Sequence, residues 1–249
     1  DGDDERRAGP VHGDDPVAIE RLIAELVAHM GDPGTAELNT SHLDGRQASL
    51  DDLRSAALSI PFLAARRLVI VRNGLARIER RNKAAQERFT ALLDEIPPSP
   101  ALVLRLDDEI ERGDWKLLPE GHWLRAWLAK AGKRALLREC RLPAVGAMPG
   151  WISKQAEGMG GRFTPAAAQA LAALVGNETQ IALHEIRKLL DYTNAKRPVE
   201  PEDVELLTAV TGQANIFEMV DALAEGNASK AQRLLQVALE NDREIVFGM

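Results

Sequence analysis

The run Leu68-Val69-Ile70-Val71 indicates the fold class of this chain, because it is apolar without alternation. A strand of this composition is covered on both faces, as in a parallel sheet between two layers of helices. Two other short runs, at 101–104 and 135–137, have the same character, and 37–43 is predicted as a weaker strand at an edge. The sequence therefore predicts a buried parallel sheet.

Helices are predicted between these strands, where they supply the crossover connections that a parallel sheet needs. Asp15 and Pro16 mark the start of the first helix. Its apolar residues repeat at the spacing of one buried face: Ile19, Leu22, Ile23, Leu26, Val27 and Met30. Ser49 is predicted to cap a second helix together with Asp52, and further helices are predicted near 82–94 and 122–131. The first 140 residues thus have the pattern of an α/β domain.

From Leu142 onward, the pattern predicts helices alone. One helix is expected at 151–158, a second is expected to start at Thr164-Pro165, and Asn177 is expected to cap a third. Together they predict a small helical bundle of about 70 residues, the size of a small independent domain.

Two more helices, at 215–225 and 228–240, are predicted near the end of the chain. They leave one apolar face uncovered, which indicates a further domain that this chain does not finish. The fold class is therefore α/β followed by all-α. The predicted segments are a disordered or altered terminus (1–13), an α/β domain (14–140), a helical lid domain (141–211) and the start of a truncated helical domain (212–249).

The composition limits the classes of protein to which the chain can belong. Its 249 residues are 45% hydrophobic and 28% charged, as in ordinary globular proteins. Cys140, the one cysteine, cannot form an internal disulfide, so a reducing, cytoplasmic setting is expected. No apolar run is long enough to span a bilayer, so no membrane partner is expected. The net charge of −7 disfavours a protein whose whole surface binds nucleic acid.

A parallel sheet followed by a helical lid is also the layout of P-loop ATPases, but the phosphate-binding motif G-x-x-x-x-G-K-[ST] is missing. An apolar strand that could lead into such a loop is not evident before His12. Asp107-Asp108-Glu109 follows a predicted strand, where an ATPase holds magnesium, and is interpreted here as a solvated strand end and helix start. The histidines show no spacing typical of metal ligands. Neither a cofactor nor a metal is expected.

A local excess of positive charge contrasts with the acidic composition. The stretch 66–88 contains only Glu79 and Glu87 as acidic residues. Its basic residues are Arg66, Arg67, Arg72, Arg77, Arg80, Arg81, Lys83 and Arg88. Such a run is compatible with a solvated face, with an acidic partner or with a phosphate backbone.

Immediately before this stretch, Ile60-Pro61-Phe62-Leu63-Ala64-Ala65 places two large apolar side chains next to each other. Pro61 can start a short helix, in which neighbouring residues point about a third of a turn apart. One of Phe62 and Leu63 is therefore expected to be exposed. Two interpretations stay open: packing under the next strand, or an anchor that inserts into the pocket of a partner.

Several segments occur in the order and approximate spacing of one known family. In the first half these are His12-Gly13-Asp14-Asp15, Leu43-Asp44-Gly45 and the run from Pro61 to Val71. In the second half these are Gly176 with Glu185-Ile186-Arg187-Lys188-Leu189, Val199-Glu200-Pro201-Glu202-Asp203-Val204 and Ile216-Phe217-Glu218-Met219-Val220-Asp221-Ala222-Leu223. Together they are similar to the delta subunit family of the bacterial DNA polymerase III clamp loader.

This resemblance implies three domains: an AAA+-like domain without a P-loop, a three-helix lid and a helical collar that joins the pentameric loader. It implies a non-catalytic accessory subunit of the replicative DNA polymerase, which binds the beta sliding clamp and opens one of its interfaces. The implied partners also include the gamma/tau and delta prime subunits, reached through the collar, and DNA, met indirectly in the assembled loader.

Carried over residue by residue, the clamp-binding pair of this family falls on Phe62 and Leu63, with Ile60 and Pro61 beside it. The family pair lies on a short helix, and its usual order is Leu then Phe, the reverse of the order here. The residues implied to face acidic clamp surface or DNA are Arg66, Arg67, Arg72, Arg77, Arg80 and Arg81. Two other functions stay open: an ATPase whose phosphate loop was lost with a missing first strand, and a helical DNA-binding adapter that uses 66–88.

Overall fold

The computed structural model describes residues 9–64, 66–78, 82–96, 101–208 and 232. The chain forms two compact units, which divide between Arg141 and Leu142. Within the described ranges, no helix is long and apolar enough to cross a membrane. The boundaries of the four predicted segments stay predictions. Residues 1–8, the predicted helix at 215–225 and, apart from residue 232, the predicted helix at 228–240 lie outside the described residues.

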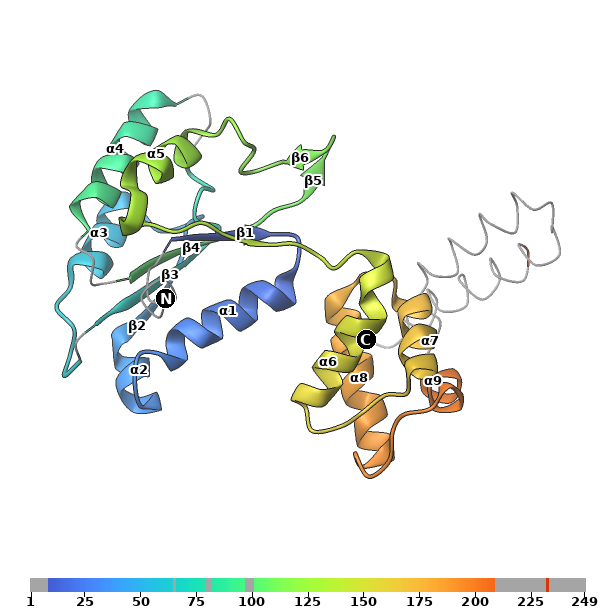
Figure 1. Ribbon diagram of the computed structural model, residues 1–249. Coiled ribbons are helices and arrows are strands. Elements are labelled where there is room, and N and C mark those ends of the chain that lie inside the picture. The colour runs from blue at the N-terminus through green and yellow to red at the C-terminus, as the bar shows by residue number, and fades with distance from the viewer. Residues whose placement is uncertain (1–8, 65, 79–81, 97–100, 209–231, 233–249) are drawn as a thin grey trace. The chain divides into compact units, whose positions relative to one another are not determined.

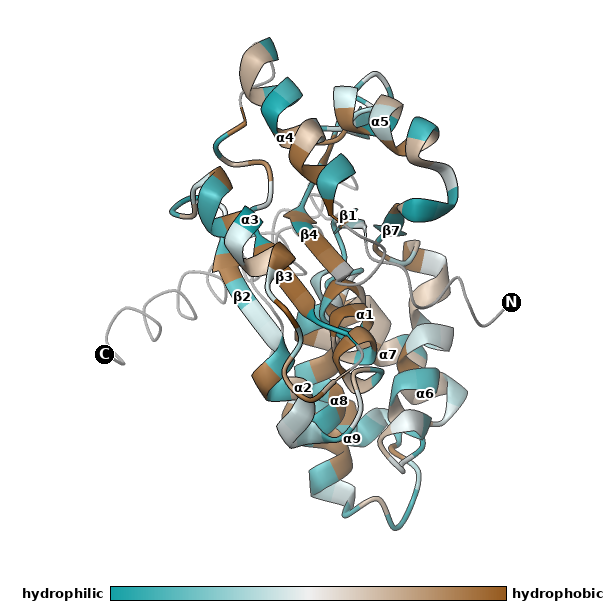
Figure 2. Ribbon diagram, turned by 90° about the vertical axis from the view of Figure 1, so that its left-hand side faces the viewer, coloured by the Kyte–Doolittle hydropathy of each residue, from teal (hydrophilic) through white to brown (hydrophobic). Residues whose placement is uncertain are grey.

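The first unit is built on a parallel sheet with the strand order β2-β3-β4-β1-β7 (Figure 1). Its strands are β1 (Pro10–Gly13), β2 (Thr40–Asp44), β3 (Leu68–Arg72), β4 (Ala101–Asp107) and β7 (Arg138–Cys140). All adjacent strands are parallel, and Leu68 lies in register with Thr40 on one side and Ala101 on the other. Figure 2 shows the hydrophobic character of β3 and β4. The predicted α/β fold class, with a second all-α part, is confirmed.

Helices cover both faces of this sheet. They are α1 (Pro16–Ala28), α2 (Pro33–Asn39), α3 (Leu50–Leu58), α4 (Lys83–Glu95) and α5 (Trp123–Ala131). Alternate residues of β3 enter different cores, because successive side chains of a strand point to opposite faces. Leu68 and Ile70 pack with residues of α1, whereas Val69 and Val71 pack with residues of α3, α4 and α5. This two-sided burial is why the strand is apolar without alternation.

The helix starts follow the predicted capping residues. The Asp15 carboxylate accepts hydrogen bonds from the backbone N–H groups of Val17 and Ala18, and Pro16 takes the first helical position. Ser49 and Asp52 form a capping box at the start of α3. Both predicted helix starts are confirmed.

The first strand corrects the prediction that structure begins at Asp14. Residues Pro10–Gly13 form β1, which pairs with β4 on one side and β7 on the other. Four residues flanked by proline and glycine contain too short an apolar run to be recognised. Gly13 is required by the close packing of strands: a Cβ there would lie 1.8 Å from the carbonyl oxygen of Cys140. The first strand is therefore present, and only residues 1–8 of the predicted terminus lie outside the described part.

Two other strands are displaced from their predicted positions. The edge strand β2 begins at Thr40, because Asp32 caps α2, Pro33 starts it and the helix continues to Asn39. The last strand covers 138–140 rather than 135–137, since a 3-10 turn at Gly132–Arg134 precedes it. Its position is set by pairing with β1, where Val11 lies opposite Arg138.

A short antiparallel hairpin follows β4. Its strands are β5 (Ile110–Glu111) and β6 (Asp114–Trp115), joined by Arg112 and Gly113, which both have positive φ. Positive φ at both central residues is typical of the type I′ turn, which matches the twist of the two strands. The sequence predicts a helix start here, and the hairpin corrects that prediction.

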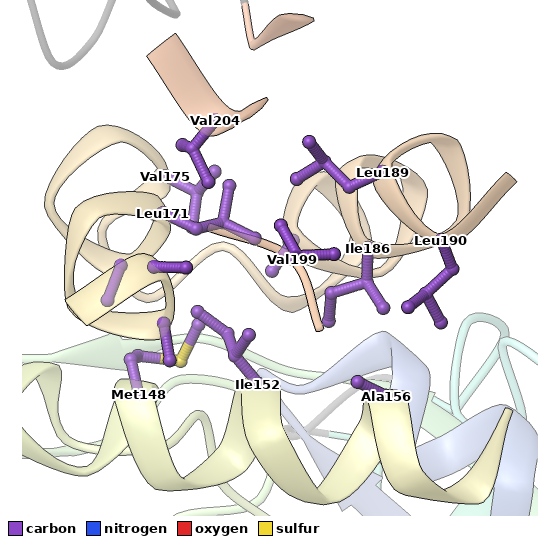
Figure 3. Close-up of a cluster of buried hydrophobic side chains, with 14 residues drawn as sticks. Met148, Ile152, Ala156, Leu171, Val175, Ile186, Leu189, Leu190, Val199 and Val204 are labelled. Carbon is purple, nitrogen blue, oxygen red and sulfur yellow. The ribbon is translucent and has the colours of Figure 1, made fainter. Parts of the chain in front are cut away.

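The second unit is helical in its described part. After a 3-10 turn at Val145–Ala147, it contains α6 (Met148–Gly158), α7 (Pro165–Val175), α8 (Thr179–Thr193) and α9 (Pro201–Leu207). Figure 3 shows that α6, α7 and α8 direct apolar side chains into one core, with Val199 lying between α7 and α8. Thr164 caps α7 as predicted. Two predictions need correction: α6 starts at Met148 rather than at residue 151, and the residue before α8 is Glu178, so Asn177 is not its cap.

An ion pair fixes the start of α9. Arg197 donates two hydrogen bonds to the Asp203 carboxylate, at 2.6 and 2.7 Å, and the backbone N–H of Glu200 donates a third at 2.9 Å. The Arg197 side chain and then the Glu200 N–H favour the charged form, so they lower the pKa of Asp203 to about 2. This contribution to stability is complete above the ordinary pKa of 3.8 and is lost as the pH falls towards 2.

We expect Asp203→Asn to lower the melting temperature of the second unit at pH 7, because it removes a charged acceptor from Arg197 and Glu200. The difference from the wild-type chain should shrink as the pH falls below 4 and vanish only below pH 2. Scanning calorimetry at several pH values measures this. Glu202→Gln, an exposed acid on the same helix, is the control and should change little. A constant difference at all pH values would contradict the assignment.

Candidate functional site

The segment 59–64, here named the anchor loop, connects α3 to β3 on the side of the sheet where β2 is the outermost strand (Figure 1). It exposes several large apolar side chains. The exposed fractions are 88% for Ile60, 57% for Phe62 and 87% for Leu63, and Pro61 is half-buried. Leu58, the last residue of α3, is 40% exposed. Both members of the predicted pair therefore face solvent, where one was expected. Neighbouring exposed apolar side chains of this size are typical of protein interaction sites.

The backbone of the anchor loop corrects the expected short helix. Helix α3 ends at Leu58, and Ser59 is extended, with φ −66° and ψ 139°. Residues Phe62, Leu63 and Ala64 form a bend instead of a helical turn. Leu63 has a φ of 50°, in the left-handed region that residues with a Cβ rarely adopt. The pair is thus presented by an irregular, strained loop.

Asn39, the last residue of α2, holds this loop. Its side chain is fully buried and binds both backbone groups of Phe62: the Phe62 N–H donates to Oδ1 at 2.7 Å, and Nδ2 donates to the Phe62 carbonyl at 2.8 Å. Nδ2 also donates to the carbonyl of Thr35 at 2.8 Å. The backbone of Phe62 is therefore fixed against α2, while its side chain points to solvent.

Leu38 precedes Asn39 on α2 and is 61% exposed. Neither residue was singled out from the sequence, because 37–43 was predicted as a strand, in which the two would have alternated across a sheet. The Asp32 cap and Pro33 were the signals that could have identified a helix here.

The predicted basic residues do not form one patch. Arg66 is exposed and Arg67 is half-buried, with its guanidinium donating to Ser41 Oγ at 2.7 Å; both precede β3. Arg72, the last residue of β3, and Arg77, which follows the strand, are both exposed. Five residue steps of about 3.3 Å place Arg72 about 16–17 Å from Arg67. Arg80 and Arg81 lie outside the described residues.

The turn from β1 to α1 has little room for a phosphate loop. β1 ends at Gly13, and Asp15 already caps α1, so Asp14 alone lies between strand and cap. The N-terminus of a helix is a natural anion site, since its N–H groups are free to donate. Here the Asp15 carboxylate accepts from Val17 N–H at 3.0 Å and Ala18 N–H at 3.1 Å. A negative side chain therefore occupies the position that a phosphate would need.

Asp108 is not the solvated strand end that was predicted. It is buried, and its carboxylate accepts from the backbone N–H groups of Glu109, Leu117 and Leu118, at 2.9, 2.7 and 3.0 Å. These bonds tie the end of β4 to the chain beyond the β5–β6 hairpin. A carboxylate with these partners has a structural role.

His12 lies in β1, opposite Leu106 near the carboxyl end of β4, and is fully buried. Its ring packs edge-on against Trp115, with centroids 5.0 Å apart, and its nitrogens lie 3.6 Å from Asp108 and 3.5 Å from Glu139. Burial, and then the nearby Arg125, lower the pKa of His12. The ring is therefore neutral at pH 7. No group of metal-ligating side chains occurs among the residues that the structure describes.

An open cleft of about 470 Å³ lies at the carboxyl ends of β3 and β4. Its polar lining includes Arg46, Asp107 and His122. Asp107 accepts hydrogen bonds from Arg105, and His122 Nδ1 accepts from the N–H of Leu124 to cap α5. Two of the three side chains are thus engaged in the fold, which leaves the anchor loop as the more exposed candidate site.

Comparisons with known proteins agree with the predicted resemblance. The family described as DNA polymerase III, delta subunit, matches residues 11–131. The chain is 23% identical over 237 residues to DNA polymerase III subunit delta of Bacillus subtilis (strain 168), covering 94% of this chain and 66% of that protein. It also matches the solved structure of the Bacillus subtilis DNA clamp loader delta protein, with a TM-score of 0.64 and 20% identity, over 94% of this chain and 67% of that one. The chain thus spans about two thirds of the length of these relatives.

We expect Ile60→Ala and Leu63→Ala to change the free energy of unfolding by less than about 0.5 kcal/mol each, because both side chains are already in water. Leu53→Ala, in the adjacent helix but buried, should cost about 2–5 kcal/mol. Urea unfolding of the three variants measures the difference. Destabilisation of the two loop variants by several kcal/mol would mean that these side chains pack inside the unit.

Proposed function

We propose that this chain, whose resemblance to the delta subunit family of DNA polymerase III is confirmed over residues 11–131, binds a ring-shaped sliding clamp and opens it for loading onto DNA. The observation that carries the proposal is the exposure of Phe62 and Leu63 on the anchor loop. These two side chains, with Ile60 and Pro61 beside them, insert into an apolar pocket of the clamp.

The mechanism needs binding energy and no chemical step. Burying Phe62 and Leu63 contributes about 1.5–3 kcal/mol each. A ligand shifts a two-state equilibrium only by its difference in affinity for the two states. The chain therefore opens the clamp by making contacts that fit the strained or open interface better than the closed one. We expect it to act as an accessory subunit without an active site of its own.

Two observations weigh against the alternative functions. An ATPase would need a phosphate site after β1, where the Asp15 carboxylate already binds the helix N–H groups. A DNA-binding adapter would need 66–88 to form one basic surface, but β3 separates Arg66 and Arg67 from Arg72 and Arg77. Arg66 is exposed and follows the anchor loop closely in sequence, which supports the proposal that it meets acidic clamp surface. Assembly with other loader subunits is assigned to 212–249, outside the described residues, and stays a prediction.

Titration of the chain with the sliding clamp of the same bacterium tests this proposal. We expect Phe62→Ala/Leu63→Ala to weaken binding about 100-fold or more, because about 3–6 kcal/mol of apolar burial is lost. The matched control is Ile110→Ala/Leu117→Ala, which removes two half-exposed apolar side chains outside the anchor loop and should leave the affinity unchanged. The wild-type affinity should depend only modestly on salt. Full affinity of the anchor variant would overturn the site assignment.

Opening is measured separately from binding, on a clamp that carries a fluorescence pair across one interface. The wild-type chain should increase the separation of the pair, and the anchor double variant should not. Binding without any change in separation would leave a clamp-binding protein and refute the opening step.

Magnesium ATP at millimolar concentration should leave the melting temperature unchanged within about 1 °C. A ligand at 100 times its Kd stabilises a protein by about 2.7 kcal/mol, which corresponds to a rise of about 5–10 °C for a chain of this size. Differential scanning fluorimetry with and without the nucleotide makes the comparison. A rise of that order would restore the ATPase alternative.

A further inference from the structure

We infer that Asn39 is a positioning residue, which holds the anchor loop in the conformation that binds the partner; the inference rests on the proposed clamp-binding function. Asn39 is fully buried, and its amide makes three hydrogen bonds of 2.7–2.8 Å. Two of them reach across 23 residues of sequence to both backbone groups of Phe62. An amide that accepts from the N–H and donates to the carbonyl of one residue imitates the pairing of two antiparallel strands.

The backbone of the loop shows why such a contact is needed. Leu63, the residue after Phe62, has a φ of 50° and an 87% exposed side chain. A branched residue in the left-handed region is strained, and its own exposed side chain supplies little packing to hold it there. A strained conformation persists only where contacts with the surrounding structure hold it in place. The hydrogen bonds from Asn39 to the Phe62 backbone, immediately before Leu63, provide such contacts.

A second contact ties down the other end of the same segment. The Arg67 guanidinium donates to Oγ of Ser41, a residue of β2, and β3 begins at the next residue, Leu68. β2 in turn pairs with β3 over five residues, from Thr40 opposite Leu68 to Asp44 opposite Arg72. The chain is therefore fixed to the end of α2 at Phe62, within the anchor loop, and to β2 at Arg67, between that loop and β3. Between these tethers the side chain of Leu63 projects into water.

Holding the loop matters for affinity because a flexible loop must be ordered when it binds. The apparent dissociation constant equals the intrinsic one divided by the fraction of molecules in the competent conformation. Contacts that keep this fraction near one strengthen binding without touching the partner. Asn39 acts in this way, through the backbone of Phe62, and makes no contact with the clamp in this account.

The test compares Asn39→Leu with Thr40→Val in the full chain. Asn39→Leu keeps the side-chain size and removes the amide. Thr40→Val removes a neighbouring side-chain bond of the same helix end, from Thr40 Oγ1 to the Ala36 carbonyl at 2.7 Å, and leaves both bonds to Phe62 in place. Asn39→Ala is a second variant in case Asn39→Leu does not fold: it fits within the same space and removes both the donor and the acceptor that bind Phe62.

Three quantities are measured: amide hydrogen exchange at Phe62, the kinetics of binding to the sliding clamp, and the melting temperature. In Asn39→Leu we expect exchange at Phe62 to be about tenfold faster and clamp binding about tenfold weaker, through a slower association rate and an unchanged dissociation rate, if about a tenth of the loops stay competent. Asn39→Ala should show a similar loss of the same kind. Thr40→Val should leave exchange at Phe62 and binding as in the wild type.

A double variant distinguishes positioning from general damage. On a Phe62→Ala background, Asn39→Leu should weaken binding by less than about threefold, since the anchor that it positions is gone and the two changes are coupled. A folded Asn39→Leu or Asn39→Ala chain that binds the clamp with wild-type affinity overturns the inference while the proposed function stands. Failure of the wild-type chain to bind the clamp overturns the proposed function and the inference with it.

Discussion

Parallel pairing along β3 is the constraint on which the first unit depends. All strands of a parallel sheet run in the same direction, so every connection that enters a strand lies at one end of the sheet and every connection that leaves lies at the other. The anchor loop precedes β3, and Asn39 lies immediately before β2, so the sheet brings them to the same end although 23 residues separate Asn39 from Phe62. The two ends of the sheet therefore carry different side chains.

Ligands of open α/β sheets usually bind at the carboxyl ends of the strands. In this chain the carboxyl ends of β1 and β4 are occupied by the protein's own side chains: Asp15 caps α1, Asp108 binds three backbone N–H groups, and His12 is buried against Trp115. The open cleft described above lies beside them, at the ends of β3 and β4. The exposed apolar side chains of the anchor loop lie at the opposite end, where the strands begin. The fold thus has an open parallel sheet and presents its candidate binding surface at the end opposite the carboxyl ends of the strands.

Regular segments with long apolar patterns could be predicted from the sequence, whereas segments fixed by pairing could not. β3, α1 and α3 follow from their apolar runs and caps, because local pattern and burial agree there. β1 could not be predicted because it is buried by pairing with β4 and β7, which lie far along the chain. Its four residues, which begin with a proline and end with a glycine, contain no apolar pattern that indicates a strand. Phe62 and Leu63 could be found as an unusual apolar pair. Asn39 could not, since one asparagine gives no local sign of a hydrogen-bond partner so far along the chain.

The Asn39 contact also bears on the proposed function, in which this chain distorts a partner by binding alone. A protein changes the shape of its partner only if its own binding surface is more rigid than the partner. If it is not, binding deforms that surface instead of the partner. The anchor loop has few contacts of its own: Ile60 and Leu63 are almost fully exposed, and Phe62 is more than half exposed. Hydrogen bonds must therefore keep the loop from moving. Asn39 of α2 binds the Phe62 backbone, and the Arg67 side chain binds the edge strand β2. Because β2 is paired along its length to β3, a force on Phe62 is transmitted to the buried sheet, the most rigid part of the unit.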